Sequence, residues 1–285
     1  MRTKLSLILA VLFTLSPAGA WADNKDDDQL GEYQAELVDV NADYANAMKD
    51  SKLWIAHQEK VNDLNEKIFN LQYKKALKAG NKPKPRIPEK AKIWLKEANE
   101  TLKNAQGPDD YTKATQGYTK VMQLAPGWSD PIYNAAKAYE MSHWYELAIM
   151  MYRSYLLTAP KAKDAKQVMN KLYELKDKMD RSFKLVRPWV QNWYIPGNDS
   201  ISNCSKPAIM VGLNLMDYVD SDGTVYMGGK PDGKLFGNQY TKPTANYGSG
   251  NYDQTYILSD DGNSLTDRTK LADNPSSDTV WQRCP

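Results

Sequence analysis

Apolar side chains recur every three or four positions across residues 29–75, the spacing that places them on one face of an α-helix. A single helix of this length would extend about 75 Å, more than a monomer could cover. The pattern therefore predicts, for residues 23–79, either a helical hairpin or an intermolecular coiled coil that makes the chain a homo-oligomer. Few Leu and Ile residues lie along this apolar face, which we call the seam. Intermolecular coiled coils usually carry more of them at these positions, so the hairpin is favoured. The seam positions are Tyr33, Leu37, Val40, Tyr44, Ala47, Ser51, Trp54, Val61, Leu64, Ile68 and Leu71, with His57 at the one polar position.

A proline-rich segment ends this helical region. Residues 80–87 fall within the sequence GNKPKPRIP, which begins at Gly80 and contains three prolines among Lys and Arg. This composition predicts a semi-rigid, basic connector. A helix is expected to begin again directly after it, with Pro88 in its first turn.

A second pattern repeats at an interval of 34 residues. Small residues at matched positions allow two helices to approach, aromatic residues fill the space between turns, and proline ends a helix because it has no backbone N–H to donate. The interval therefore predicts stacked helical hairpins. The matched pairs are Ala114 with Ala148, Tyr118 with Tyr152, Leu124 with Thr158 and Pro126 with Pro160.

Residues 88–186 resemble tetratricopeptide repeats, on the motifs Ile132-x-x-Ala135-Ala136-x-x-Tyr139 and Ala148-x-x-x-Tyr152 followed by Pro160. The resemblance implies one good repeat, one degenerate repeat and a capping helix from about Ala162 to Asp180, arranged as an α-solenoid. Departures occur at Leu102 and Ala105 in the first repeat, and at Pro188, which interrupts the third.

In this family the first helices of the repeats line a concave groove that holds a protein or peptide partner. Lys103, Lys137 and Lys171 recur at the repeat interval, so they are expected to form a ladder that attracts a carboxylate or another extended anionic ligand. Alternatively, the lysines are ordinary solvated residues, and Glu140 and Glu174, which also recur, neutralise them. The groove positions that the resemblance implies are Lys96, Asn99, Lys103, Asp130, Tyr133, Lys137, Glu140, Asp164, Gln167, Lys171 and Glu174.

After Glu174 the chain contains no Glu, and Asp, Asn, Gly, Ser and Tyr become frequent, which predicts a loop-rich β domain over residues 187–285. An apolar run from Ala208 to Val219, then Asp220-Ser221-Asp222-Gly223 and Thr224 to Met227, predicts a hairpin. Further turns are expected at Pro231-Asp232-Gly233 and Asp260-Asp261-Gly262-Asn263. We expect a small antiparallel domain of about four to six short strands. The whole chain is thus predicted to be multidomain, α plus β.

Three clusters in this segment allow two interpretations each. Trp189, Trp193 and Tyr194 either dock the β domain on the capping helix or form ordinary core. Asp220 and Asp222 either bind calcium or form a plain turn, and the absence of a later Glu favours the turn. Flat aromatic side chains among amides either stack on a sugar or form a small β core, and these are Tyr240, Tyr247, Tyr252 and Tyr256.

The first 22 residues have the features of a secretory signal peptide. Arg2 and Lys4 precede an apolar run too short to span a bilayer, and Ala20-Trp21-Ala22 offers a cleavage site. We therefore expect a periplasmic or secreted protein, cleaved after Ala22, with no membrane span in the mature chain. In an oxidising compartment the two cysteines, Cys204 and Cys284, are expected to form a disulfide bond.

Charge and motif content limit the possible functions. The chain has 37 basic and 35 acidic residues, and loss of Arg2 and Lys4 leaves 35 of each, so it has no basic footprint for nucleic acid. Only His57 and His143 are present, both in predicted helices, and no catalytic, metal or cofactor motif occurs. The sequence predicts a non-enzymatic binding adaptor. A carbohydrate or cell-wall binding protein and a self-assembling structural subunit are the alternatives.

Overall fold

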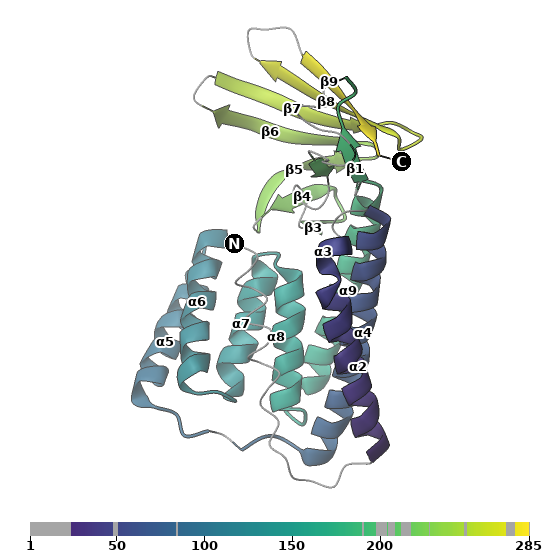
Figure 1. Ribbon diagram of the computed structural model, residues 1–285. Helices are drawn as coiled ribbons and strands as arrows, with labels where there is room; N and C mark the ends of the chain where they lie inside the picture. The colour runs from purple at the N-terminus through teal and green to yellow at the C-terminus, as the bar shows by residue number, and fades with distance from the viewer. Residues whose placement is uncertain are drawn as a thin grey trace.

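The computed structural model describes residues 24–47, 51–83, 85–189, 191–197, 204, 209–211, 218–227, 229–247, 250–271 and 277–284. The expected signal peptide lies outside this part of the chain. Helices make up the N-terminal part and an antiparallel sheet makes up the C-terminal part (Figure 1), so the predicted combination of helical and β structure is confirmed. Within the described residues, every helix is too short or too polar to cross a bilayer.

The N-terminal helices form an antiparallel pair within one chain. The pair consists of α2 (Asn24–Ala42) and α4 (Ser51–Ala79), with the short α3 (Tyr44–Ala47) between them in the sequence. Lys60 of α4 lies 2.5 Å from Glu36 of α2, and Lys74 lies 2.8 Å from Asp26. The buried imidazole of His57 donates from Nε2 to the carbonyl oxygen of Val40 at 3.0 Å. The polar seam position thus joins the two helices by a hydrogen bond.

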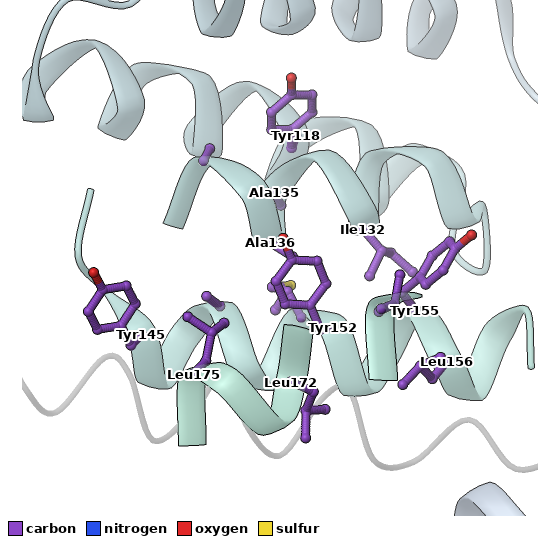
Figure 2. Close-up of a cluster of buried hydrophobic side chains, with 14 of the residues drawn as sticks. Tyr118, Ile132, Ala135, Ala136, Tyr145, Tyr152, Tyr155, Leu156, Leu172 and Leu175 are labelled. Atoms are coloured by element: carbon purple, nitrogen blue, oxygen red, sulfur yellow. The ribbon is translucent and has the colours of Figure 1, made fainter. Parts of the chain in front are cut away.

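Five helices follow in a row, each packed against the next (Figure 1). They are α5 (Glu89–Lys103), α6 (Pro108–Leu124), α7 (Ser129–Met141), α8 (Tyr145–Thr158) and α9 (Ala165–Val186). Ala136 and Ala148 are fully buried, and Tyr152 is buried beside Ala136 (Figure 2). The last helix was expected to end near Asp180 but reaches Val186. A proline disfavours helical conformation in the residue before it, and the first proline after Asp180 is Pro188.

The N-terminal pair packs onto this row through α4. Glu66 lies 2.5 Å from Arg153 of α8 and 2.7 Å from Lys176 of α9. The guanidinium of Arg153 also lies 5.1 Å from the ring centroid of Phe69, which is buried. The connector after α4 follows the end of α8, where Lys82 N–H donates to the Thr158 carbonyl at 3.0 Å. Helix α4 therefore covers α8 and α9, and the N-terminal pair is part of the helical body.

The C-terminal part is a nine-stranded antiparallel sheet in the order β2-β1-β9-β8-β7-β6-β5-β4-β3. The expectation of four to six short strands was too low, because the later strands carry many polar residues whose alternation is hard to recognise. The strands are β1 (Gln191–Tyr194), β2 (Ile209–Val211), β3 (Tyr218–Val219), β4 (Thr224–Met227), β5 (Lys230–Phe236), β6 (Gln239–Tyr247), β7 (Gly250–Leu258), β8 (Ser264–Leu271) and β9 (Ser277–Arg283).

Two of the three predicted turns occur in the structure. Residues 220–223 join β3 to β4, where Val219 pairs with Val225, and residues 259–263 join β7 to β8. The predicted turn at residues 231–233 is wrong, because these residues belong to β5. Gly233 pairs with Val225 of β4, and Pro231 pairs with Tyr226, so the extra residue of the register shift is Asp232 on β5. A side chain at Gly233 would clash with the carbonyl oxygen of Thr241. The lack of a side chain at Gly233 therefore allows β5 to approach Thr241 of β6 closely.

The sheet rests on the end of the helical body. Trp189 and Trp193 are buried in a core shared with Ile55 of α4 and Val186 of α9, so they are core residues and also join the two parts. Val219 N–H donates to the Ser182 hydroxyl of α9 at 2.8 Å. A third contact comes from the turn between α7 and α8, where His143 stacks on Tyr226 of β4. This turn was predicted as helix, but His143 has φ of 60°.

The two cysteines lie at disulfide distance, as predicted, with their Cα atoms 5.4 Å apart and a sequence separation of 80. Cys284 directly follows β9. The pair therefore joins the segment before β2 to the C-terminal end of the sheet.

Candidate functional site

A pocket of about 310 Å³ lies on one face of the row of helices, where α5, α7, α8 and α9 meet. Its side chains come from three helices and from the residue that precedes a fourth. They are Leu95 and Asn99 of α5, Asp130, Tyr133 and Asn134 of α7, Tyr155 of α8, and Asp164 at the start of α9.

Helical spacing explains why these side chains converge. Residues three or four positions apart lie on the same face of a helix. Leu95 and Asn99 are four apart on α5, and Tyr133 and Asn134 follow Asp130 by three and four on α7. Because α5 and α7 are both first helices of a hairpin, their matching faces turn toward the same side of the row.

Asn99, an exposed residue of the pocket lining, joins three helices. Its Oδ1 accepts a hydrogen bond from the Tyr118 hydroxyl of α6 at 2.9 Å and another from Asn134 Nδ2 of α7 at 2.9 Å. Burial raises the pKa of Tyr118 to about 12, so its hydroxyl remains a donor at neutral pH. The amide oxygen of Asn99 is thus committed to holding the pocket in shape.

Tyr155 and Tyr133 form the aromatic wall. Their ring centroids are 5.2 Å apart, and Tyr133 also makes an edge contact with Tyr152 at 6.0 Å. The hydroxyl of Tyr155 donates to Asp164 Oδ1 at 2.6 Å. Burial, and then the neighbouring carboxylate of Asp164, raise the pKa of Tyr155. Both rings therefore face the pocket as neutral phenols, beside an acidic side chain.

The third member of the predicted lysine ladder is neutralised. Lys171 lies 2.9 Å from Glu174 and 3.3 Å from Glu140, and Glu140 also accepts from the Tyr152 hydroxyl at 2.8 Å. The hydrogen bond to Glu174, and then the charge of Glu140, raise the pKa of Lys171 against the opposing effect of its burial. Lys171 is therefore engaged within the protein.

The other two lysines of the ladder are exposed. Neither Lys103 nor Lys137 makes an ion pair within the described residues, and the ammonium of Lys137 lies 5.9 Å from the Tyr133 ring centroid. Lys103 belongs to a second hollow of about 300 Å³ on α5, which shares two residues with the first pocket. Its lining is Lys92, Leu95, Lys96, Asn99, Glu100 and Lys103.

The structure brings four of the positions implied by the repeat resemblance into the main pocket, namely Asn99, Asp130, Tyr133 and Asp164. Gln167 is exposed on α9 and does not line it. The sequence interpretation missed Leu95, Asn134 and Tyr155. Leu95 and Asn134 each lie one helical turn from a recognised position, so helical spacing could have identified them. Tyr155 lies on α8, the second helix of its hairpin, where no groove position was expected.

The calcium and sugar interpretations find little support in the described residues. There, no group of three acidic, His or Cys side chains is arranged to hold a metal ion. Asp222 lies 2.7 Å from Lys234, and Asp220 Oδ1 accepts from Thr224 N–H at 2.9 Å, as in a plain turn. Tyr240 and Tyr256 stack on each other in the core, which removes them as a surface for sugar. The side chains of residues 247 and 252 lie outside the described part.

Comparison of the chain with protein-family models and with curated proteins finds no match.

Proposed function

We propose that this chain is an exported, non-enzymatic adaptor that holds an extended peptide segment of a protein partner. The segment would bind along the face formed by α5, α7 and α9, which we interpret as the concave groove of a short tetratricopeptide-like solenoid. The pocket between these helices is the observation that carries the proposal. It is open to solvent and lined by side chains of α5, α7 and α8 and by Asp164, the residue that precedes α9.

The chemistry of this lining supports binding more than catalysis. An aromatic wall, two carboxylates and two amides are arranged around one hollow, which is the mixture of apolar area and few polar groups that ligand sites use. Six of the seven lining residues lie on helices and Asp164 is the N-cap residue of α9, so the surface is preorganised. A preorganised surface loses little conformational entropy when an extended peptide binds.

The proposed location outside the cytoplasm rests on the signal-like residues 1–22 and on the cysteine pair. Disulfide bonds persist in oxidising compartments and are rare in the cytosol. The distance between Cys204 and Cys284 is compatible with such a bond.

Tyr133→Ala tests the groove. The variant should lose most of the partner that co-purifies with the wild-type chain after gentle cross-linking, because it removes half of the aromatic wall. Tyr173→Ala is the matched control, since Tyr173 lies on α9, is 54% exposed and does not line the pocket. Thermal unfolding of both variants would separate loss of binding from loss of the fold. Equal recovery of partner with both variants contradicts the proposal.

A further inference from the structure

The main pocket has a one-sided charge. Two of its seven lining residues are carboxylates, Asp130 and Asp164, and none is Lys or Arg. Neither carboxylate forms an ion pair within the described residues, although eighteen such pairs occur there. The lining of the pocket therefore carries negative charge and no positive charge of its own, and a cation from outside the lining, Lys137, lies at the Tyr133 ring.

Asp164 holds its carboxylate toward the pocket. It occupies the N-cap position of α9, where an Asp side chain usually accepts from a backbone N–H of the first turn, yet it makes no such bond. Its Oδ1 accepts from Tyr155 instead. Within the described residues, Oδ2 has no partner. An oxygen of this carboxylate thus remains free beside the rings.

The aromatic wall suits the same charge. Cations are attracted to the faces of tyrosine rings within about 6 Å of the centroid, and Lys137 of this chain already lies 5.9 Å from Tyr133. A carboxylate beside a ring strengthens that attraction, because both present negative potential to the ligand. The rings and the two carboxylates therefore select for a cationic group with an apolar stem.

Building on the proposed function, we infer that the pocket receives the arginine or lysine side chain of the bound peptide. The cationic head pairs with Asp164 and Asp130, and the aliphatic stem lies against Tyr133, Tyr155 and Leu95. The lysine ladder predicted an anionic ligand, whereas this inference predicts a cationic one. The third lysine of the ladder, Lys171, is already paired with Glu140 and Glu174.

The test is selection of random dodecapeptides displayed on phage against the immobilised chain without residues 1–22. We expect arginine and lysine to be enriched over the starting library. Synthetic copies of selected peptides should bind at least about tenfold more weakly when the basic residue is replaced by citrulline or norleucine, because a charge-assisted hydrogen bond is lost.

Variants of the chain locate the effect. Asp130→Asn combined with Asp164→Asn should weaken the same peptides about tenfold, as expected for loss of charge-assisted bonds. Asp180→Asn, an exposed change elsewhere on α9, should leave binding unchanged. Lys137→Glu gives the sharpest result, because it adds negative charge beside Tyr133. It strengthens binding of a basic peptide and weakens binding of an acidic one.

Each outcome has a different meaning. Selected peptides without basic residues, or peptides that lose affinity with Lys137→Glu, would overturn this inference while leaving a peptide-binding groove in place. Failure to select any peptide would overturn the groove function together with the inference. Basic peptides whose affinity is insensitive to Asp130→Asn with Asp164→Asn would also refute the pocket assignment.

Discussion

Glu66 and Arg153 are 87 positions apart in the sequence, yet their carboxylate and guanidinium groups lie 2.5 Å from each other. Their side chains are only 24% and 18% exposed, and Lys176 pairs with the same carboxylate oxygen. This contact attaches the N-terminal helices to α8 and α9. It makes the helical body one packed unit, on which the proposed binding face depends for its rigidity.

Glu66→Gln should therefore lower the free energy of unfolding by about 2 kcal/mol, because it leaves Arg153 charged and largely buried without its partner. Glu59→Gln is the matched control, since Glu59 pairs with Arg187 at the surface with both side chains more than half exposed. Its cost should be below about 1 kcal/mol. Urea unfolding of the two variants measures the difference, and equal costs would show that the buried pair contributes nothing specific.

The cost of Glu66→Gln should depend on pH. Burial alone would raise the pKa of Glu66, but the hydrogen bond from Lys176 and the charge of Arg153 outweigh it and lower the pKa. A carboxyl group whose pKa is lowered in the folded state contributes its full stabilisation at any pH above its unfolded pKa of about 4.3. The contribution is lost as the pH falls from that value through the lowered pKa of the folded state. The wild-type chain and the variant should therefore converge in stability at acid pH.

His143 should make the contact between the sheet and the helices sensitive to pH in a higher range. Its ring stacks on Tyr226 at 4.0 Å. Burial, the largest effect, and the charge of Lys178 lower its pKa, while Asp220 opposes them. A histidine whose pKa is lowered in the folded state contributes its full stabilisation at any pH above its unfolded pKa of about 6.5. This contribution is lost as the pH falls below that value.

We expect unfolding free energy to decrease between about pH 7.5 and about pH 5.5, a window that brackets the ordinary histidine pKa. His143→Asn should remove most of that decrease, since asparagine tolerates the left-handed backbone found at this position. Urea unfolding at the two pH values measures both slopes. A slope unchanged by the substitution would assign the pH dependence to another group.

Gly229 lies where the turn between β4 and β5 touches the turn between α7 and α8. A Cβ atom there would lie 2.5 Å from the Ser142 carbonyl oxygen and 2.7 Å from Trp144 Nε1, and φ is +75°. Gly237 has φ of +56° with open space around it. Gly237→Ala should cost about 1 kcal/mol for the backbone alone, and Gly229→Ala should cost at least about 1 kcal/mol more, because it also overpacks the contact.

Thermal unfolding of the two glycine variants, with near-ultraviolet circular dichroism to follow the tryptophans, measures this difference. Indistinguishable midpoints would mean that the sheet does not dock on the helices through this turn.

The cysteine pair should stabilise the sheet chiefly by restricting the unfolded chain. For a separation of 80 residues, the chain-entropy model gives about 4.5 kcal/mol. The double variant Cys204→Ser with Cys284→Ser should unfold at a lower urea concentration than the wild-type chain. Reduction of the wild-type protein should reproduce that change, and a variant that unfolds like the oxidised wild type would contradict the pairing.

Local signals carried the successful predictions. The hairpin at residues 220–223 was recognisable because Gly223 supplies the positive φ that its turn requires. Asn99, Asp130, Tyr133 and Asp164 were implied as groove positions by the resemblance to tetratricopeptide repeats; the structure places them together in one pocket, and their role in binding stays a prediction. The disulfide partners followed from the presence of two cysteines.

Long-range packing explains what the sequence did not reveal. Nothing local connects Glu66 with Arg153, and the direction of the Asp164 carboxylate depends on Tyr155 of another helix. The segment Pro231-Asp232-Gly233 has turn composition, but Pro231 and Gly233 both pair with β4 and only Asp232 is the extra residue of an irregularity inside β5. Such features depend on partners that become neighbours only in the folded chain.

Site-specific photo-crosslinking tests the central claim most directly. A photoreactive phenylalanine analogue would replace Tyr133 in the pocket or the exposed Tyr173 on α9, in the chain expressed in the cells that produce it naturally. We predict that ultraviolet light produces a discrete adduct with a partner polypeptide from position 133 and not from position 173. No adduct at position 133, or the same adducts at both positions, would contradict the claim that this face binds a partner.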